Sequence, residues 1–211
     1  MNAMGKDRTN TAAQSAQHQD RDHRGQGIAL VVMGVSGCGK STIAEKIAGA
    51  LHWPMVEGDD LHPAANIAKM KRHQPLNDAD RRPWLASIGK QIDRWHVEGS
   101  SGIITCSALK RRYRDGLVQG GEGEAGRPQL RFVYLKGSKD LIRERLSHRA
   151  GHFMPADLLD SQFADLEEPA DDEPAINVDI DATPEAIAAE IIDRLRLAAA
   201  PDLPAAPARH D

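Results

Sequence analysis

Residues 34–41 of this chain read Gly34-Val35-Ser36-Gly37-Cys38-Gly39-Lys40-Ser41, and they indicate its fold more clearly than any other segment. This stretch matches the pattern G-x-x-x-x-G-K-[ST], in which glycines let backbone N–H groups fold around a phosphate chain at the N-terminus of a helix. An apolar strand, residues 28–33, leads into the loop, and a helix with apolar Ile43, Ile47 and Leu51 leads out of it. A glycine-rich turn that matched by accident would not need these flanking elements in register. The stretch therefore predicts a phosphate-binding loop between a strand and a helix.

The residue types of the loop predict separate roles. We expect Lys40 to reach the β- and γ-phosphates of a nucleotide and the Ser41 hydroxyl to ligate Mg²⁺. Cys38 is interpreted as a small residue that a tight loop tolerates rather than as a redox group. The predicted nucleotide-binding residues are Gly34, Val35, Ser36, Gly37, Cys38, Gly39, Lys40, Ser41 and Thr42.

Composition limits the size and the partners of the protein. The chain has 211 residues, of which 40% are hydrophobic, so it can form one sizeable core. A net charge of −4 argues against nucleic acid as the principal partner. Two cysteines are too few for a disulfide framework, and no apolar run approaches the ~20 residues of a membrane span. With no signal peptide core at the start, we expect a cytoplasmic protein without a membrane partner.

The pattern along the chain predicts three regions. Residues 1–26 are polar without an apolar period, which predicts a disordered tail. Residues 27–197 alternate apolar strands with helices and form the single predicted domain. Residues 198–211 are rich in Ala and Pro and are expected to be a second tail.

The predicted domain is an α/β fold with a mostly parallel sheet. After the first strand, apolar runs follow at residues 54–57, 103–106, 132–135 and 176–180. A helix over about residues 79–98 has Asn77 as its predicted N-cap, and the last helix has Thr183 as N-cap with Pro184 at its first position. Such alternation implies a five-stranded sheet with helices on both faces, and ligands then bind at the carboxyl ends of the strands.

Acidic residues follow the second predicted strand in the stretch 57–63, Glu-Gly-Asp-Asp-Leu-His-Pro. A kinase that acts on a hydroxyl group needs a carboxylate to position the nucleophile and accept its proton. Asp59 is our candidate for this base, and Glu57 is a candidate for contact with the waters of Mg²⁺. An ordinary solvated turn in which Asp60 caps a helix would fit the same residues.

Basic residues follow the third and fourth predicted strands. On a helix, Lys110 and Arg114 would lie four residues apart and share a face, where together they could hold a carboxylate. Residues 111–112 fit a plain basic helix surface. The second run, residues 143–153, reaches a glycine that could act as a hinge, so its arginines could close over transferring phosphates as part of a lid. This run also contains His148 and His152, four residues apart. We do not expect them to bind zinc, because no carboxylate accompanies them as the Glu does in H-E-x-x-H.

These segments together resemble the small bacterial gluconokinases. The similarity covers about residues 28–197 and rests on the phosphate loop and on residues 57–63, 66–70, 75–85, 106–115 and 149–153, in the same order and spacing. The resemblance implies ATP-dependent phosphorylation of D-gluconate at its 6-hydroxyl, and the phosphate loop adds the expectation of Mg²⁺ as cofactor. It also implies a nucleoside-monophosphate-kinase-like fold with strand order 2-3-1-4-5, a mobile lid over about residues 145–162, and a homodimer.

The motif, the residue chemistry and the resemblance together give the candidate residues their expected roles. The expected catalytic residues are Lys40, Asp59, Arg145 and Arg149; by resemblance, Asp59 faces the accepting hydroxyl and the two arginines take lid positions. The expected gluconate contacts are Asp59, His62, Lys110 and Arg114, and the expected magnesium contacts are Ser41 and Glu57. Some relatives have Asp where this chain has Glu57, which affects how directly that carboxylate meets the metal.

Two rival functions share the phosphate loop. A shikimate kinase or a nucleoside monophosphate kinase would also have lid arginines, but should lack the blocks at residues 75–85 and 106–115. A non-enzymatic nucleotide switch would need a guanine-reading N-K-x-D tetrapeptide, and the sequence after the loop contains none.

Overall fold

The structure is a computed structural model that describes residues 27–72, 74–120, 127, 129–147 and 156–198. The tails expected at residues 1–26 and 198–211 lie outside these ranges, except for Ala198. Part of the expected lid, including Arg149, lies outside them as well. None of the helices in the described part is long and apolar enough to cross a membrane.

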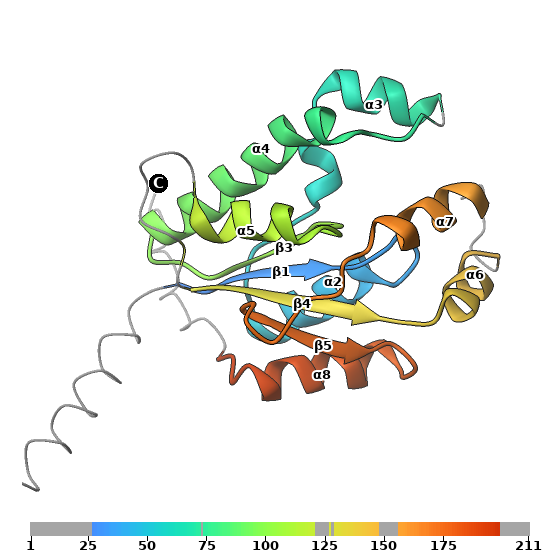
Figure 1. The fold of residues 1–211 in the computed structure, drawn as a ribbon. Helices are drawn as coiled ribbons and strands as arrows, with labels where there is room; N and C mark the ends of the chain where they lie inside the picture. The colour runs from blue at the N-terminus through green and yellow to red at the C-terminus, as the bar shows by residue number, and fades with distance from the viewer. Residues whose placement is uncertain (1–26, 73, 121–126, 128, 148–155, 199–211) are drawn as a thin grey trace, which may run out of the picture.

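Strands and helices alternate along the described chain (Figure 1). The strands are β1 (Ala29–Met33), β2 (Met55–Val56), β3 (Gly102–Thr105), β4 (Leu130–Lys136) and β5 (Ala175–Asp179). The helices are α2 (Lys40–Leu51), the 3₁₀ helix η2 (Gly58–Leu61), α3 (Ala64–Lys71), α4 (Asp78–Val97), α5 (Arg111–Gln119), α6 (Lys139–Ser147), α7 (Ala156–Asp165) and α8 (Pro184–Arg194).

The five strands form one parallel sheet in the order β2-β3-β1-β4-β5, which confirms the predicted order. The central strand β1 pairs with β3 on one side and with β4 on the other, so that Val32 lies opposite both Thr105 and Val133. The carboxyl ends of these strands therefore meet at one edge of the sheet. The loops that follow β1, β2 and β3 carry the candidate residues to this edge.

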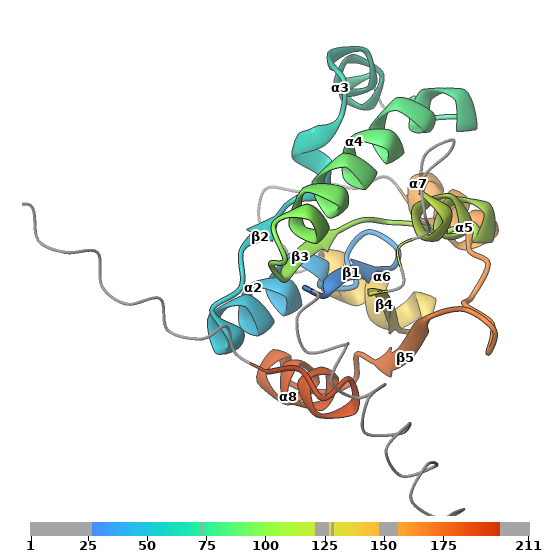
Figure 2. The same cartoon turned by 90° about the vertical axis from the view of Figure 1, so that its left-hand side faces the viewer.

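Alternate side chains of β1 enter two cores on opposite faces of the sheet. Leu30 and Val32 are fully buried on the face covered by α2 and α8, whereas Val31 and Met33 are fully buried on the face covered by α4 (Figure 2). Because both faces are covered, β1 is apolar throughout rather than alternating.

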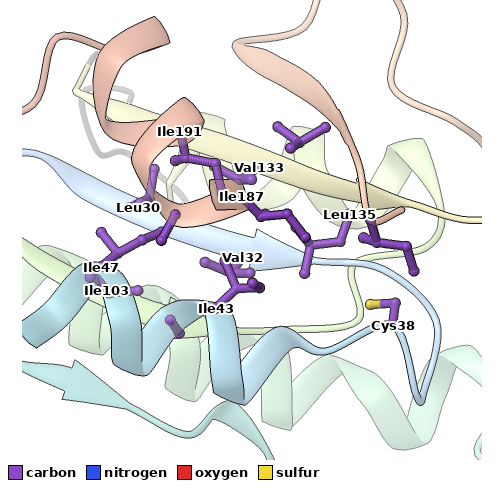
Figure 3. Packing of buried hydrophobic residues seen from close by; sticks show 14 of the residues in the cluster. Leu30, Val32, Cys38, Ile43, Ile47, Ile103, Val133, Leu135, Ile187 and Ile191 are labelled. Atoms are coloured by element: carbon purple, nitrogen blue, oxygen red, sulfur yellow. The ribbon is translucent and has the colours of Figure 1, made fainter. Parts of the chain in front are cut away.

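The first core fixes the position of α2 and with it the phosphate loop. Helix α2 packs against α8 as well as against the sheet. Figure 3 shows the side chains that fill this space, among them Leu30, Val32, Cys38, Ile43, Ile47, Ile103, Val133, Leu135, Ile187 and Ile191. Burying each large aliphatic side chain of this kind stabilises a fold by roughly 1.5–3 kcal/mol. The helix that begins at the loop is thus held along its whole apolar side.

The two predicted N-caps are confirmed. In α4 the backbone N–H of Asp80 donates to the side-chain oxygen of Asn77 over 2.9 Å, and the Asn77 N–H donates back to the Asp80 carboxylate over 3.0 Å. In α8 the hydroxyl of Thr183 accepts from the N–H of Ala186 over 3.3 Å, with Pro184 at the first helical position. The reciprocal pair in α4 and the single bond in α8 satisfy N–H groups that a helix start leaves unpaired.

Candidate active site

The phosphate loop connects β1 to α2 through left-handed backbone. Gly37 and Gly39 have φ values of 85° and 99°, which an L side chain rarely adopts. A Cβ atom on Gly37 would also lie 2.7 Å from the side chain of Leu146, so α6 closes over the loop. Gly39 is the N-cap of α2, and no side chain caps this helix. The backbone geometry therefore fits a phosphate group at the helix N-terminus.

Lys40 lies back over the loop from the first position of α2. Its Nζ atom donates to the backbone oxygens of Gly34 and Val35, each over 3.1 Å. Cys38 beside it is buried, and burial raises the pKa of its thiol. This agrees with the interpretation of Cys38 as a packing residue, because a thiol with a raised pKa is a poor nucleophile at neutral pH.

Gln162 of α7 makes a contact with the loop that the sequence did not predict. The backbone N–H of Ser36 donates to Gln162 Oε1 over 2.7 Å, and Gln162 Nε2 donates to the Ser36 hydroxyl over 3.0 Å. These two bonds join residues 126 positions apart in the chain. Helix α7 is thus attached to the phosphate loop through one amide side chain.

A cavity of about 470 Å³ opens beside the loop. Its lining comes from the loop, α2, α6 and the start of α8: Gly37, Cys38, Gly39, Thr42, Ile43, Arg145, Leu146, Ala182, Pro184 and Ile187. Arg145 is held in this wall because its Nη2 atom donates to the backbone oxygen of Ile180 over 2.7 Å. The structure thus places one of the two predicted lid arginines next to the phosphate loop.

Asp59 lies on η2, directly after β2, with a side chain that is 81% exposed. Its Oδ1 atom is 4.0 Å from Nε2 of His62, which is buried. His62 stacks on Trp84 of α4 with a centroid separation of 4.3 Å, and the indole Nε1 donates to the Gly58 oxygen over 2.7 Å. The loop that carries Asp59 is therefore anchored on α4, while the carboxylate itself faces solvent.

Glu57 is fixed to the end of the neighbouring strand. The Thr105 hydroxyl donates to Glu57 Oε2 over 2.5 Å and accepts from the backbone N–H of Gly58 over 3.1 Å. Since Thr105 ends β3, this pair joins the carboxyl ends of β2 and β3. The carboxylate of Glu57 thus lies at the sheet edge that also carries the phosphate loop.

The arrangement predicted for Lys110 and Arg114 is wrong. Helix α5 begins at Arg111, and Lys110 precedes it with extended backbone, so the two cations do not share a helix face. Arg114 points inward: its guanidinium is 1% exposed and donates to both carboxylate oxygens of Glu173, over 2.5 and 2.8 Å. We therefore correct the role of Arg114 from substrate contact to buried structural ion pair.

A second cation does lie near Lys110, but it comes from α4. Nζ of Lys110 lies 2.9 Å from one oxygen of Asp165, and Nη1 of Arg81 lies 3.9 Å from the other. The hydrogen bond to Asp165 raises the pKa of Lys110, which therefore stays charged at neutral pH. Because Asp165 and Gln162 lie three residues apart on α7, one helix touches both this cation pair and the phosphate loop.

Replacing Arg114 with alanine is expected to destabilise the fold by roughly 3–5 kcal/mol, because it leaves the Glu173 carboxylate buried without its partner. Denaturant unfolding of the variant and of the parent chain measures this difference. The surface variant Arg111→Ala, which loses exposed pairs with Asp172 and Asp115, serves as the control and should change stability by less than about 1 kcal/mol.

The Arg114 pair also predicts a pH dependence of stability. Arg114 lowers the pKa of Glu173 below its ordinary value. The stabilisation from the ion pair is therefore complete when the pH is above the pKa of Glu173 in the unfolded chain. It is lost as the pH falls through the lower pKa that Glu173 has in the folded chain. An Arg114→Ala chain whose stability matches the parent at neutral pH would contradict this account of the pair.

The described residues contain no group of three or more His, Cys, Asp or Glu side chains that could hold a metal ion. His148 and His152, for which no zinc role was expected, lie outside the described ranges. A metal held by one hydroxyl, waters and substrate phosphates does not need such a group, and this is the usual mode of Mg²⁺ in nucleotide sites.

The fold and the loop at its centre define a P-loop kinase of the nucleoside-monophosphate-kinase-like class. Residues 30–169 match a family described as an AAA domain. The chain belongs to the gluconokinase family: the gluconokinase of Gluconobacter oxydans is 47% identical over 163 residues, which cover 77% of this chain and 88% of that protein. The thermoresistant gluconokinase of Escherichia coli is 43% identical over 167 residues, 79% of this chain and 92% of that protein.

Solved structures agree with this assignment. A gluconokinase from Sinorhizobium meliloti superposes with a TM-score of 0.68 at 41% identity, covering 82% of this chain and 98% of that one. The shikimate kinase of Aquifex aeolicus superposes with a TM-score of 0.52 at 13% identity, covering 80% and 96% of the two chains. The second likeness supports the shared fold alone.

Proposed function

We propose that this protein transfers the γ-phosphoryl group of ATP to the 6-hydroxyl of D-gluconate, giving 6-phospho-D-gluconate and ADP. Three groups meet at one sheet edge and support this proposal: the phosphate loop after β1, Asp59 after β2 and Lys110 after β3. A phosphoryl donor, a proton acceptor and a carboxylate-binding cation are what this reaction needs. Analysis of the product by ³¹P and ¹³C NMR tests whether the phosphate is on C6.

The nucleotide side of the proposed site is formed by the loop and the cavity beside it. The ATP phosphates lie against the loop amides and Lys40, and the adenine base lies in the cavity near Leu146 and Pro184. The residues present fit Mg²⁺, which Ser41 would ligate directly and Glu57 through a water. When bound, Mg²⁺ supplies charge neutralisation at the phosphate oxygens. Arg145 and Arg149, at their lid positions, stabilise the charge of the transferring group.

The acceptor side centres on Asp59. Its carboxylate takes the proton of the 6-hydroxyl as the new O–P bond forms and the bond from the γ-phosphorus to ADP breaks. Lys110 and Arg81 hold the gluconate carboxylate, a role in which Arg81 replaces the buried Arg114. In the structure Asp165 pairs with both cations, so the gluconate carboxylate must displace the Asp165 carboxylate when it binds. His62 is the remaining proposed gluconate contact, and its Nε2 atom lies 4.0 Å from Asp59 Oδ1.

The proposed enzyme also has a lid that closes over the substrates and a partner subunit. We propose that residues of about 145–162 close over the bound substrates, which excludes water from the transferring phosphate. We also propose that the enzyme is a cytoplasmic homodimer without a nucleic-acid or membrane partner. Size-exclusion chromatography with light scattering tests the dimer.

Replacing Lys110 with alanine is expected to raise the KM for gluconate about tenfold or more while leaving the KM for ATP unchanged. A charge-assisted hydrogen bond contributes about 1.5–3 kcal/mol, and the variant loses one that is made to the acceptor alone. Steady-state kinetics with each substrate varied in turn measures the effect. Arg112→Ala, an exposed neighbour that pairs with Asp78, is the control. An unchanged KM for gluconate in Lys110→Ala would move the carboxylate site elsewhere.

A further inference from the structure

Asn66 is a buried amide in the first turn of α3, and its orientation is determined by its neighbours. Its side-chain nitrogen lies 2.8 Å from the backbone oxygen of Asp80. A carbonyl oxygen only accepts hydrogen bonds, so the group that faces it must be the NH₂ group. A flipped amide would set two carbonyl oxygens against each other in a buried place. The NH₂ assignment is therefore fixed by chemistry.

The same NH₂ group determines the tautomer of His62. Nδ2 of Asn66 also lies 3.2 Å from Nδ1 of His62, and it has a second hydrogen to donate there. Nδ1 must then carry a lone pair, and the neutral imidazole carries its hydrogen on Nε2. Nε2 is the atom that lies 4.0 Å from Asp59 Oδ1. The hydrogen thus points toward the proposed catalytic carboxylate.

The ring cannot easily turn away from this arrangement. Trp84 stacks on one face at an interplanar angle of 14°, and the side chain of His62 is 5% exposed. Two charged groups face the ring: Asp59 on η2 and Arg81 on α4. Burial lowers the pKa of His62, Asp59 opposes this change, and Arg81 adds to it. A protonated ring would also direct an N–H group at the NH₂ group of Asn66.

We propose that Asn66 is a positioning residue that holds His62 in its Nε2–H tautomer, so that His62 orients the Asp59 carboxylate. Oδ1 of the exposed carboxylate lies 4.0 Å from Nε2 and must come about 1 Å closer to reach hydrogen-bond distance. Oδ2 is then the oxygen that accepts the proton of the acceptor hydroxyl. The positioning role rests on the proposed function, whereas the tautomer follows from the contacts of Asn66 alone.

The tautomer is tested by long-range ¹H–¹⁵N NMR on the full chain labelled with ¹⁵N-histidine, in which His62→Gln identifies the His62 signals. We expect the Nε2–H tautomer at pH 7.5 and a neutral ring at pH values below the ordinary histidine range of about 6.5. An Nδ1–H tautomer, or titration at the ordinary value, would overturn the proposal.

The positioning role is tested with Asn66→Ala and with Lys69→Ala as the matched control. Lys69 lies on the same helix and bonds the side chain of Asp80, but it has no contact with His62. We expect Asn66→Ala to lower kcat for gluconate roughly tenfold, with an unchanged KM for ATP and a new dependence of kcat on pH near the histidine pKa.

Three results would count against the positioning role. Asn66→Ala with unchanged kcat would overturn it, and so would an equal, pH-independent loss in both variants, which indicates a purely structural effect. A parent chain that fails to phosphorylate gluconate would overturn the proposed function and the positioning role together. In that case the NMR measurement still determines the tautomer of His62. Failure of the proposed function can therefore be distinguished from failure of the tautomer assignment.

Discussion

Replacing Lys40 with methionine is expected to lower kcat for gluconate phosphorylation by a factor on the order of 10²–10³. The Nζ atom lies over the phosphate loop, where it bonds the oxygens of Gly34 and Val35, and the phosphates of ATP are proposed to bind at this loop. In the proposed reaction the charge on the transferring group develops beside this ammonium, so loss of the ammonium should raise the barrier rather than only weaken binding. Methionine keeps an unbranched apolar stem and is one atom shorter than lysine.

Single-turnover kinetics with saturating ATP measures the Lys40→Met effect, and thermal unfolding checks that the fold is retained. Lys46→Ala is the matched control, because Lys46 is an exposed lysine of the same helix that pairs with Glu185 at the surface. The control should retain kcat within about twofold, since exposed pairs contribute little. A Lys40→Met enzyme with near-normal kcat would remove Lys40 from the site.

Replacing Asp59 with asparagine is expected to lower kcat by a factor on the order of 10²–10⁴, the usual contribution of a positioned general base. The amide has the same shape but cannot take the proton of the acceptor hydroxyl. Because the side chain is 81% exposed and lies away from both cores, the fold and the binding of ATP should be unaffected. The loss should therefore fall on kcat, with an unchanged dissociation constant for ATP.

Isothermal titration with a non-hydrolysable ATP analogue measures nucleotide binding by Asp59→Asn separately from its kcat. Asp60→Asn is the control: it changes the next carboxylate of η2, which is also exposed, and should leave kcat close to that of the parent. Equal losses of ATP binding and of kcat in Asp59→Asn would assign Asp59 a structural role instead.

The fold could be predicted closely because its signals are local. Each of these signals involves residues within a few positions of one another: the glycine pattern at residues 34–41 and the caps Asn77 and Thr183. The structure has all three at the predicted positions. Parallel pairing then follows from the alternation of strands and helices. The edge that carries the loop, Asp59 and Lys110 is a consequence of this topology.

The error at Arg114 has a long-range cause. A helix that included Lys110 would have put both cations on one face, but α5 begins one residue later. The partner of Arg114 is Glu173, 59 residues away, and it precedes β5. Local sequence contains no sign of this pair, since a buried arginine and a substrate-binding arginine look alike in a basic run.

The contacts of α7 were missed for a similar reason. Gln162 reaches the phosphate loop and Asp165 reaches Lys110 only after the chain has folded over the sheet edge. Their spacing of three residues on a helix was the one available signal, and it indicates a shared face without identifying what that face touches. Asn66 likewise looks like an ordinary polar helix residue until Asp80 and His62 are brought beside it.

A coupled ATP-to-ADP assay of the purified chain with Mg²⁺ tests the proposed reaction itself, when turnover is compared with D-gluconate, shikimate, AMP and no acceptor. We expect turnover with gluconate that far exceeds turnover with any of the others. Turnover with another acceptor but not with gluconate would leave the fold and the phosphate loop in place and contradict the proposed substrate.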